Sequence, residues 1–339
     1  MGIDVDWIDG VDYKTMSPKA YPAVRFCYAR FVEDNMLTPQ AWTPEKHANK
    51  PGDVGAWRAH MNVLQTIVHN KISSALILED DVDFDVTLKT QLSEFARGTR
   101  TIQKVSPPPP KSTLRNVNTD YDPSTVPPSI HNSPYGPDWE MLWLGYCGTG
   151  SREEQLGQPR RFYVIPHDPT VRPSTHHPEG LSWGPLFAAY PELQQHRVVF
   201  NAQDVVCSVA FAITYEGARR ALATFSMRGL DEPMDLSYRA LCNGELGVRF
   251  RCMAPYPPLI TSWRAAGPVS RDSDIVDDRG TSWHPAHSVG IVYSTMLNIV
   301  DLVAGSRTAK AQWDDVVPAH IDPKTFKIPR GVLWMPDAM

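Results

Sequence analysis

One short stretch of the sequence constrains the fold more than any other. The apolar residues 75–78, Ala-Leu-Ile-Leu, run directly into Glu79, Asp80 and Asp81. An apolar run of this length is too short for a helix and is typical of a strand buried on both faces. Because open α/β proteins bind ligands at the carboxyl ends of such strands, we expect the three acids to line a ligand site.

The chemistry of adjacent carboxylates favours a bound cation. Carboxylates that crowd together repel one another and raise each other's pKa, and a divalent ion removes that conflict. Hard oxygen ligands suit Mg²⁺ or Mn²⁺, which keep positions free for substrate phosphates. In a regular strand Glu79 and Asp81 share one face, so Asp80 and Asp81 need a bend to converge on one ion. The alternative is a solvated acidic strand end or a set of helix caps.

The pattern along the chain predicts an α/β fold, with a mostly parallel sheet flanked by helices in a single domain. The predicted strands cover residues 5–8, 75–78, 139–145, 205–214 and 248–253, and the predicted helices cover residues 55–70, 88–97, 216–227, 234–241 and 289–304. Their alternation favours parallel strands. Residues 105–138, rich in Pro, Ser, Thr and Asn, are expected to form a surface insertion.

Charge and hydropathy exclude two kinds of partner. The formal net charge is -5, and Lys and Arg are scattered, which argues against nucleic acid. No apolar run reaches the ~18 residues of a membrane span, so no transmembrane segment is expected.

The five cysteines contain no CxxC pair, so no structural zinc site is predicted. Cys207 and Cys252 lie in apolar runs, which favours buried free thiols. One or two disulfides stay open as the alternative if the protein is secretory.

Several blocks of the sequence, in order, carry a family resemblance. Residues 52–60 look like a G-x-x-G-C-x-x-S-H segment, and residues 75–82 match a hydrophobic strand followed by Glu-Asp-Asp. The further blocks are residues 139–145, 208–222, 232–235 and 255–260, with 274–275. Together they resemble glycosyltransferase family 25, the lipopolysaccharide-type sugar transferases and collagen galactosyltransferases.

The resemblance implies a GT-A-like fold and transfer of a sugar, often galactose, from a UDP-sugar to a glycan or glycoprotein acceptor, usually with Mn²⁺. Carried onto this chain, it implies that Asp80 and Asp81 hold the metal and the diphosphate. Glu79 and His60 would contact the donor, while Asp81 and Asp235 would be catalytic. The catalytic domain would cover residues 1–275, and residues 276–339 would be an extension packed on it.

The chain departs from the family pattern at two places. Ala56 and Ala59 stand where the pattern has Cys and Ser. Family members begin with a strand ending in Asn-Leu, whereas residues 1–8 align only with the family segment beyond that strand. The resemblance therefore implies weakened donor binding, and the alternative function is a non-catalytic, family-derived binding protein. A metal-dependent hydrolase would need a second His/Asp cluster, which is not apparent. Localisation stays open, with the secretory pathway as one option.

Individual candidates each have a structural alternative. His60 lies on the apolar stripe of its predicted helix, where a hydrogen-bonded core histidine is common. Asp235 falls in the first turn of a helix, where the helix dipole favours an acid. His176 and His177 lie in a Pro-rich loop with no partner acid at helical spacing and are not predicted to bind metal. Tyr146 and Trp183 could stack on a base or a sugar.

Overall fold

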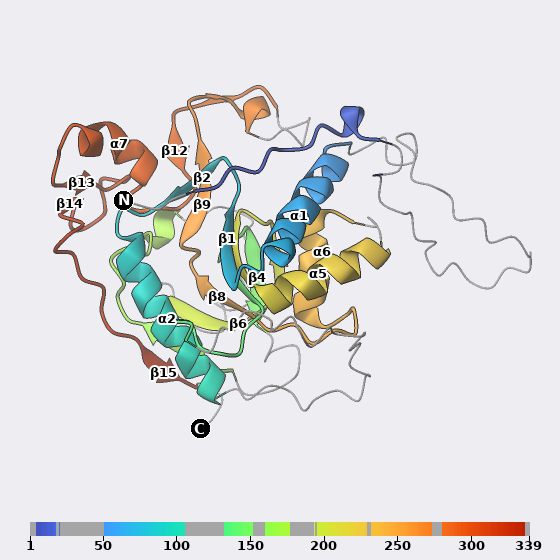
Figure 1. Cartoon of the computed structure of the whole chain (residues 1–339). Coiled ribbons are helices and arrows are strands. Elements are labelled where there is room, and N and C mark those ends of the chain that lie inside the picture. The colour runs from blue at the N-terminus through green and yellow to red at the C-terminus, as the bar shows by residue number, and fades with distance from the viewer. Residues whose placement is uncertain are drawn as a thin grey trace, which may run out of the picture.

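An eight-stranded sheet forms the centre of the computed structural model, and nearly all of its neighbouring strands are antiparallel (Figure 1). The order is β1-β7-β3-β8-β6-β5-β15, with β4 paired to β6. The strands are β1 (Ser74–Leu78), β3 (Met141–Gly145), β4 (Gly148–Ser151), β5 (Phe162–Ile165), β6 (Arg197–Val206), β7 (Ala210–Thr214), β8 (Cys252–Tyr256) and β15 (Val332–Trp334). The structure describes residues 5–17, 20, 51–105, 132–151, 160–176, 193, 195–228, 232–272 and 280–335.

The prediction of a mostly parallel sheet is wrong. Among the described strands, β3 and β8 are the parallel pair. The run at 205–214, predicted as one strand, breaks near Cys207, which has a positive φ of 65°. Because of this break, β6 ends there and β7 pairs antiparallel with both β1 and β3. The architecture is therefore mixed α/β, in one domain.

Five helices in the described part of the chain confirm the helical predictions, with shifted ends. They are α1 (Pro51–His69), α2 (Leu88–Val105), α5 (Tyr215–Arg228), α6 (Met234–Asn243) and α7 (Thr295–Val303). Residues 5–8 form no strand, and the strand predicted at 248–253 begins later, as β8. None of the helices in these described residues is long and apolar enough to cross a membrane.

Alternating side chains on the central strands build two cores. Met141 and Trp143 of β3 point into the core that contains the apolar residues of α1, α5 and α6, whereas Leu142 and Leu144 point into the core that contains those of α2. This is the period of two that a strand between two helical layers requires. Figure 1 shows α1, α5 and α6 together on one side of the sheet and α2 apart from them.

Strand β1 is the edge strand of the sheet as far as the structure describes it. The prediction that both of its faces are buried is wrong. The side chain of Leu76 is 42% exposed. The backbone N–H groups of Glu79 and Tyr215 donate across the β1–β7 pair. Since antiparallel pairs alternate, the backbone groups of Ser74, Leu76 and Leu78 face away from β7. The apolar sequence predicted burial, but among the described strands only β7 pairs with β1.

The remaining strands form three small sheets. One has the order β12-β9-β2, with β2 (Val82–Phe84), β9 (Ile260–Arg264) and β12 (His287–Ser288). The others pair β10 (Gly267–Pro268) with β11 (Trp283–His284), and β13 (Ala309–Lys310) with β14 (His320–Ile321). Short 3-10 helices cover Tyr13–Thr15 (η1), Ser174–His176 (η3) and Val269–Arg271 (η5). The C-terminal residues join the rest of the fold through β12 and through β15, which pairs with β5.

Two disulfides overturn the prediction of free thiols. Cys147 is bonded to Cys207 and Cys242 to Cys252, with Cα atoms 5.4 and 5.6 Å apart. The sequence could not show these pairings because they depend on how the segments that carry the cysteines approach one another in space. Cys27 lies outside the described residues.

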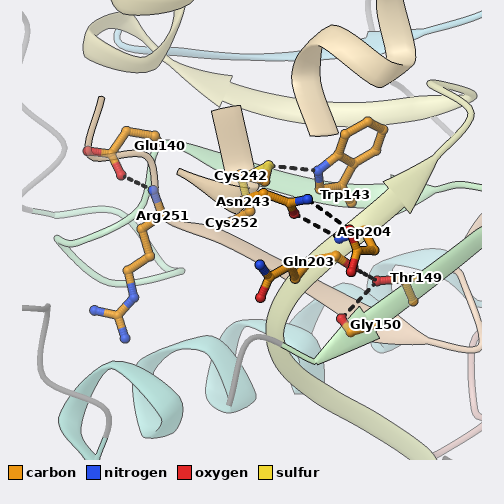
Figure 2. The surroundings of a disulfide bond; sticks show 10 residues. All are labelled: Glu140, Trp143, Thr149, Gly150, Gln203, Asp204, Cys242, Asn243, Arg251 and Cys252. Carbon is orange, nitrogen blue, oxygen red and sulfur yellow. Dashed lines mark hydrogen bonds between the residues drawn. A yellow bond between two sulfur atoms is a disulfide. The ribbon is translucent and has the colours of Figure 1, made fainter. Parts of the chain in front are cut away.

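Helix α6 is fixed at its C-terminal end by contacts that Figure 2 shows. The Cys242–Cys252 bond ties α6 to β8, and the indole N–H of Trp143 donates to the Cys242 sulfur at 3.3 Å. The Asn243 side chain both accepts from the backbone N–H of Asp204 in β6, at 3.0 Å, and donates to its carboxylate, at 2.8 Å. These bonds determine where the first turn of α6, which carries Asp235, lies against the sheet.

Candidate active site at the end of strand β1

The acid run lies where the chain passes from the central sheet to the small β12-β9-β2 sheet. The N–H of Glu79 still donates to Val209 O, at 3.0 Å, whereas the carbonyl of Asp81 accepts from the N–H of Trp263 in β9. Asp80 and Asp81 form the turn between these two pairings. The bend that Asp80 and Asp81 need in order to approach one ion is therefore present.

Glu79 is the most strongly perturbed carboxyl of the run. Its Oε1 accepts a 3.1 Å hydrogen bond from the hydroxyl of Ser208, in the loop between β6 and β7. Burial, followed by repulsion from Asp81, Asp235 and Asp80, raises the pKa of Glu79 to about 7, although the Ser208 bond opposes this rise. A carboxyl with this pKa exchanges its proton near neutral pH.

Asp235 reaches from α6 towards the same loop. Its Oδ2 accepts a 2.8 Å hydrogen bond from the backbone N–H of Cys207. Pro233 is the N-cap of α6, and no side chain caps the helix there. Asp235 thus bonds to the loop that also supplies Ser208, and the Cys147–Cys207 disulfide ties this loop to the segment after β3.

His60 of α1 lies among aromatic side chains of the core. Its ring stacks on Phe211 with the centroids 6.0 Å apart and meets the edge of Tyr238 at 5.7 Å. Burial lowers the pKa of His60 to about 4, and the charge of Asp235 opposes this fall. The ring is therefore neutral at pH 7. Its Nδ1 is buried without a hydrogen-bond partner among the described residues.

Asp81 has a basic partner that the sequence did not indicate. The guanidinium of Arg264, at the end of β9, donates to Asp81 Oδ2 and lies 4.0 Å from Asp272. The Asp81 side chain remains 38% exposed, and Asp80 is exposed. Both residues can therefore be reached from solvent. Arg264 is 183 positions from Asp81 in sequence, so no local pattern could have linked them.

The acids that follow Asp81 have a structural role. Asp83 accepts hydrogen bonds from the N–H groups of Phe84 and Met296 and from the hydroxyl of Ser294. Asp85 accepts from the N–H and hydroxyl of Thr87 and from the N–H of Tyr293. Both side chains are almost fully buried. They attach residues 293–296 to β2 and are separate from the candidate site.

Two of the remaining candidates have structural contacts. The hydroxyl of Tyr146 donates to Pro255 O at 2.5 Å. The ring of His176 stacks on Trp313 and its Nε2 lies 2.7 Å from Asp315. His177 and Trp183 lie outside the described residues, as do residues 274–275 of the last family-like block.

The donor set suits a cation held partly by substrate rather than enclosed by protein. The neighbouring carboxylates that raise the pKa of Glu79 are hard oxygen ligands with excess negative charge. In the described part of the chain, however, no three or more His, Cys, Asp or Glu side chains are grouped so as to hold a metal ion. Mg²⁺ is often held by one or two carboxylates together with substrate phosphates, and Asp80 and Asp81 fit that arrangement.

Comparisons of the chain with protein-family models, with curated proteins and with solved structures gave no match.

Proposed function

We propose that the chain is a metal-dependent glycosyltransferase that moves a sugar, galactose in the first instance, from a UDP-sugar to a glycan or glycoprotein acceptor. The observation that carries this proposal is the grouping of Glu79, Asp81, Asp235 and His60 at one end of β1. These residues come from α1, from α6 and from the end of a strand, and they influence one another's charge.

Asp80 and Asp81 would hold Mn²⁺ or Mg²⁺, which when bound would supply positive charge to the departing diphosphate. Their exposure supports this role, because a metal shared with a substrate must be reachable from solvent. When the metal binds, Arg264 would lose part of its contact with Asp81. It would remain close to the diphosphate as a second positive charge.

Glu79 would accept the proton of the acceptor hydroxyl. Burial raises the pKa of Glu79, and a divalent ion on Asp80 and Asp81 would offset the repulsion from those two acids, so Glu79 would be charged and able to accept a proton when the metal is bound. The Ser208 hydroxyl would orient its carboxylate. Asp235 would keep the local field negative, and neutral His60 would form part of the wall of the donor pocket.

The test is UDP-galactose hydrolysis and transfer with Mn²⁺, comparing the unaltered protein with Asp80→Ala, Asp81→Ala and Glu79→Gln. We expect each substitution to lower kcat by about 100-fold or more, the range of a lost general base or metal ligand. Asp315→Ala, which alters an exposed carboxylate bonded to His176, serves as the matched control. Activity unchanged in all three site variants would remove the proposal.

One observation favours a non-catalytic, family-derived binding protein as the second candidate. Within the described structure β1 has a free edge and an exposed Leu76, although it directly precedes the acid run. A donor pocket normally needs walls on both sides of such a strand. This candidate predicts that UDP with Mn²⁺ leaves the melting temperature unchanged, whereas the glycosyltransferase predicts a rise that requires both.

A further inference from the structure

A small cavity beside the acid run contains a buried positive charge. Its volume is about 220 Å³, and its lining includes Tyr146, Cys147, Arg172, Val209, Thr261 and Ser262. Sites for whole ligands usually measure ~300–1,000 Å³, so this cavity suits one chemical group of a larger molecule.

Among the described residues, Arg172 has no anionic partner of the kind that a buried arginine normally has. Its side chain is part of a residue only 3% exposed, and its Nε has no hydrogen-bond partner in the described structure. Its guanidinium does bond to the Tyr256 side chain, but no carboxylate pairs with it among the described residues, and burial lowers its pKa. A buried charge without a counter-charge is costly, which indicates that an anion from outside the chain completes the site.

Arg197 provides an internal comparison in the same region. It is equally buried, yet its Nε lies 2.7 Å from Asp168 Oδ2, and its other nitrogens donate to Thr170 and to the carbonyl of Pro257. The fold therefore neutralises one of these two buried arginines and leaves the other facing a cavity.

A second polar group of the cavity comes from β9. The hydroxyl of Thr261 in β9 is buried without a hydrogen-bond partner within the described structure, and Thr261 lines the same space. An anionic oxygen held by Arg172 could accept a hydrogen bond from this hydroxyl. The tyrosine hydroxyl of Tyr146 is already bonded to Pro255 O.

The cavity shares its walls with the candidate active site. The carbonyl of Val209 accepts a hydrogen bond from the N–H of Glu79. Ser262 directly precedes Trp263, whose N–H donates to the carbonyl of Asp81. Cys147 is bonded to Cys207, the residue that contacts Asp235. A group bound in the cavity would therefore lie next to the acid run.

We propose that this cavity is an anion subsite, in which Arg172 and Thr261 bind one carboxylate or phosphate group of a ligand that also reaches the acid run. Sugar transfer is not required for this proposal, because the binding depends on the cavity alone and needs neither metal nor nucleotide.

The experiment titrates the full chain, without metal, with inorganic phosphate in one arm and acetate in the other. The readouts are the melting temperature and the NMR signal of the Arg172 side-chain Nε–H. We expect at least one anion to raise the melting temperature and move that signal. The anion that binds more tightly identifies the group as phosphate or carboxylate.

Three variants sharpen the test. Arg172→Met should weaken binding at least ~10-fold, since a charge-assisted hydrogen bond is lost, and Thr261→Val should weaken it about fivefold. Arg307→Gln, which removes an exposed arginine, should leave the affinity unchanged and so controls for general charge. Binding by Arg172→Met equal to that of the unaltered chain would overturn the proposal.

The anion-subsite proposal can still be tested if Arg172→Met does not fold. The Nε–H signal of Arg172 in the unaltered chain still reports contact with the anion. If that signal stays in place at saturating phosphate and at saturating acetate, the proposal is wrong whatever the variants do.

Discussion

The backbone N–H of Cys207 and the carboxylate of Asp235 are joined by a 2.8 Å hydrogen bond that links helix α6 to the loop between β6 and β7. The next residue of that loop, Ser208, donates to Glu79 at the end of β1. Two consecutive residues thus contact two of the candidate acids. The Cys147–Cys207 disulfide fixes this loop, so it should influence the chemistry of Glu79 as well as stability.

Breaking the two disulfides separately should give different results at the site. The chain-entropy model gives about 4 kcal/mol for the 60-residue separation of Cys147 and Cys207 and about 3 kcal/mol for the 10-residue separation of Cys242 and Cys252. We expect both pairs of Cys→Ser substitutions to lower the melting temperature. Only the Cys147/Cys207 pair should raise the pKa of Glu79 further, because releasing the loop removes the Ser208 hydrogen bond that lowers this pKa. Carboxyl NMR titration measures this, and a pKa that stays near 7 would contradict the link.

Stability should depend on pH through Glu79. Its pKa is raised from 4.5 to about 7 in the folded chain, so the folded state holds this proton more tightly than the unfolded state. The free energy of unfolding must then fall as pH rises from about 4.5 to about 7, by at most about 3 kcal/mol from this group. Asp85, whose pKa burial raises to about 6, acts in the same direction.

Glu79→Gln isolates the first contribution, because glutamine does not titrate and can still accept the Ser208 bond. We expect the free energy of unfolding of this variant, minus that of the unaltered chain, to increase from pH 4 to pH 8. Urea unfolding measures this difference. Parallel curves for the two proteins across that range would show that Glu79 is not the titrating group.

Truncation of Asp83 should destabilise the fold much more than truncation of Asp80. Asp83→Ala removes the acceptor for two backbone N–H groups and the Ser294 hydroxyl in a buried setting, which should cost about 3 kcal/mol. Asp80→Ala alters an exposed side chain and should change stability by less than ~0.5 kcal/mol. Chemical denaturation measures both, and similar losses would refute the division into structural and functional acids.

Arg264 should compete with metal for Asp81. The pair is partly exposed, and such ion pairs contribute up to about 1 kcal/mol. Arg264→Gln is therefore expected to tighten Mn²⁺ binding about fivefold in the absence of nucleotide, as measured by calorimetry. Arg219→Gln, which breaks the similar Arg219–Glu216 pair on α5, is the control. Weaker Mn²⁺ binding in Arg264→Gln would show that Arg264 does not compete with the metal for the Asp81 carboxylate.

The sequence predicted the helices better than the sheet. The predicted helix at 55–70 corresponds to α1 and the one at 216–227 to α5, because the apolar spacing that marks a helix is local in sequence. Strand direction depends instead on partners far along the chain. The positive φ at Cys207 ends β6, and no residue pattern marks that break. The apolar run of β1 likewise predicted two covered faces, although Leu76 is exposed.

The site was partly predictable for the same physical reason. Glu79, Asp80 and Asp81 are consecutive, so their grouping needs no tertiary information. Asp235 lies close enough to Glu79 to raise its pKa, and close enough to His60 to affect the pKa of that ring. The family-like blocks contain all three residues, whose roles stay predictions. Ser208, Arg264 and the Cys147–Cys207 bond come from distant segments. Nothing in the local sequence distinguishes these residues from ordinary polar or apolar positions.

The most direct measurement is the binding of UDP by calorimetry, with and without Mn²⁺, to the unaltered chain and to Asp80→Ala with Asp81→Ala. If the acids after β1 hold a divalent ion against a diphosphate, UDP will bind only when Mn²⁺ is present, and the double variant will lose at least ~10-fold in affinity while Asp315→Ala does not. UDP affinity that is the same with and without Mn²⁺, or the same in the double variant, would contradict the proposed role of these residues.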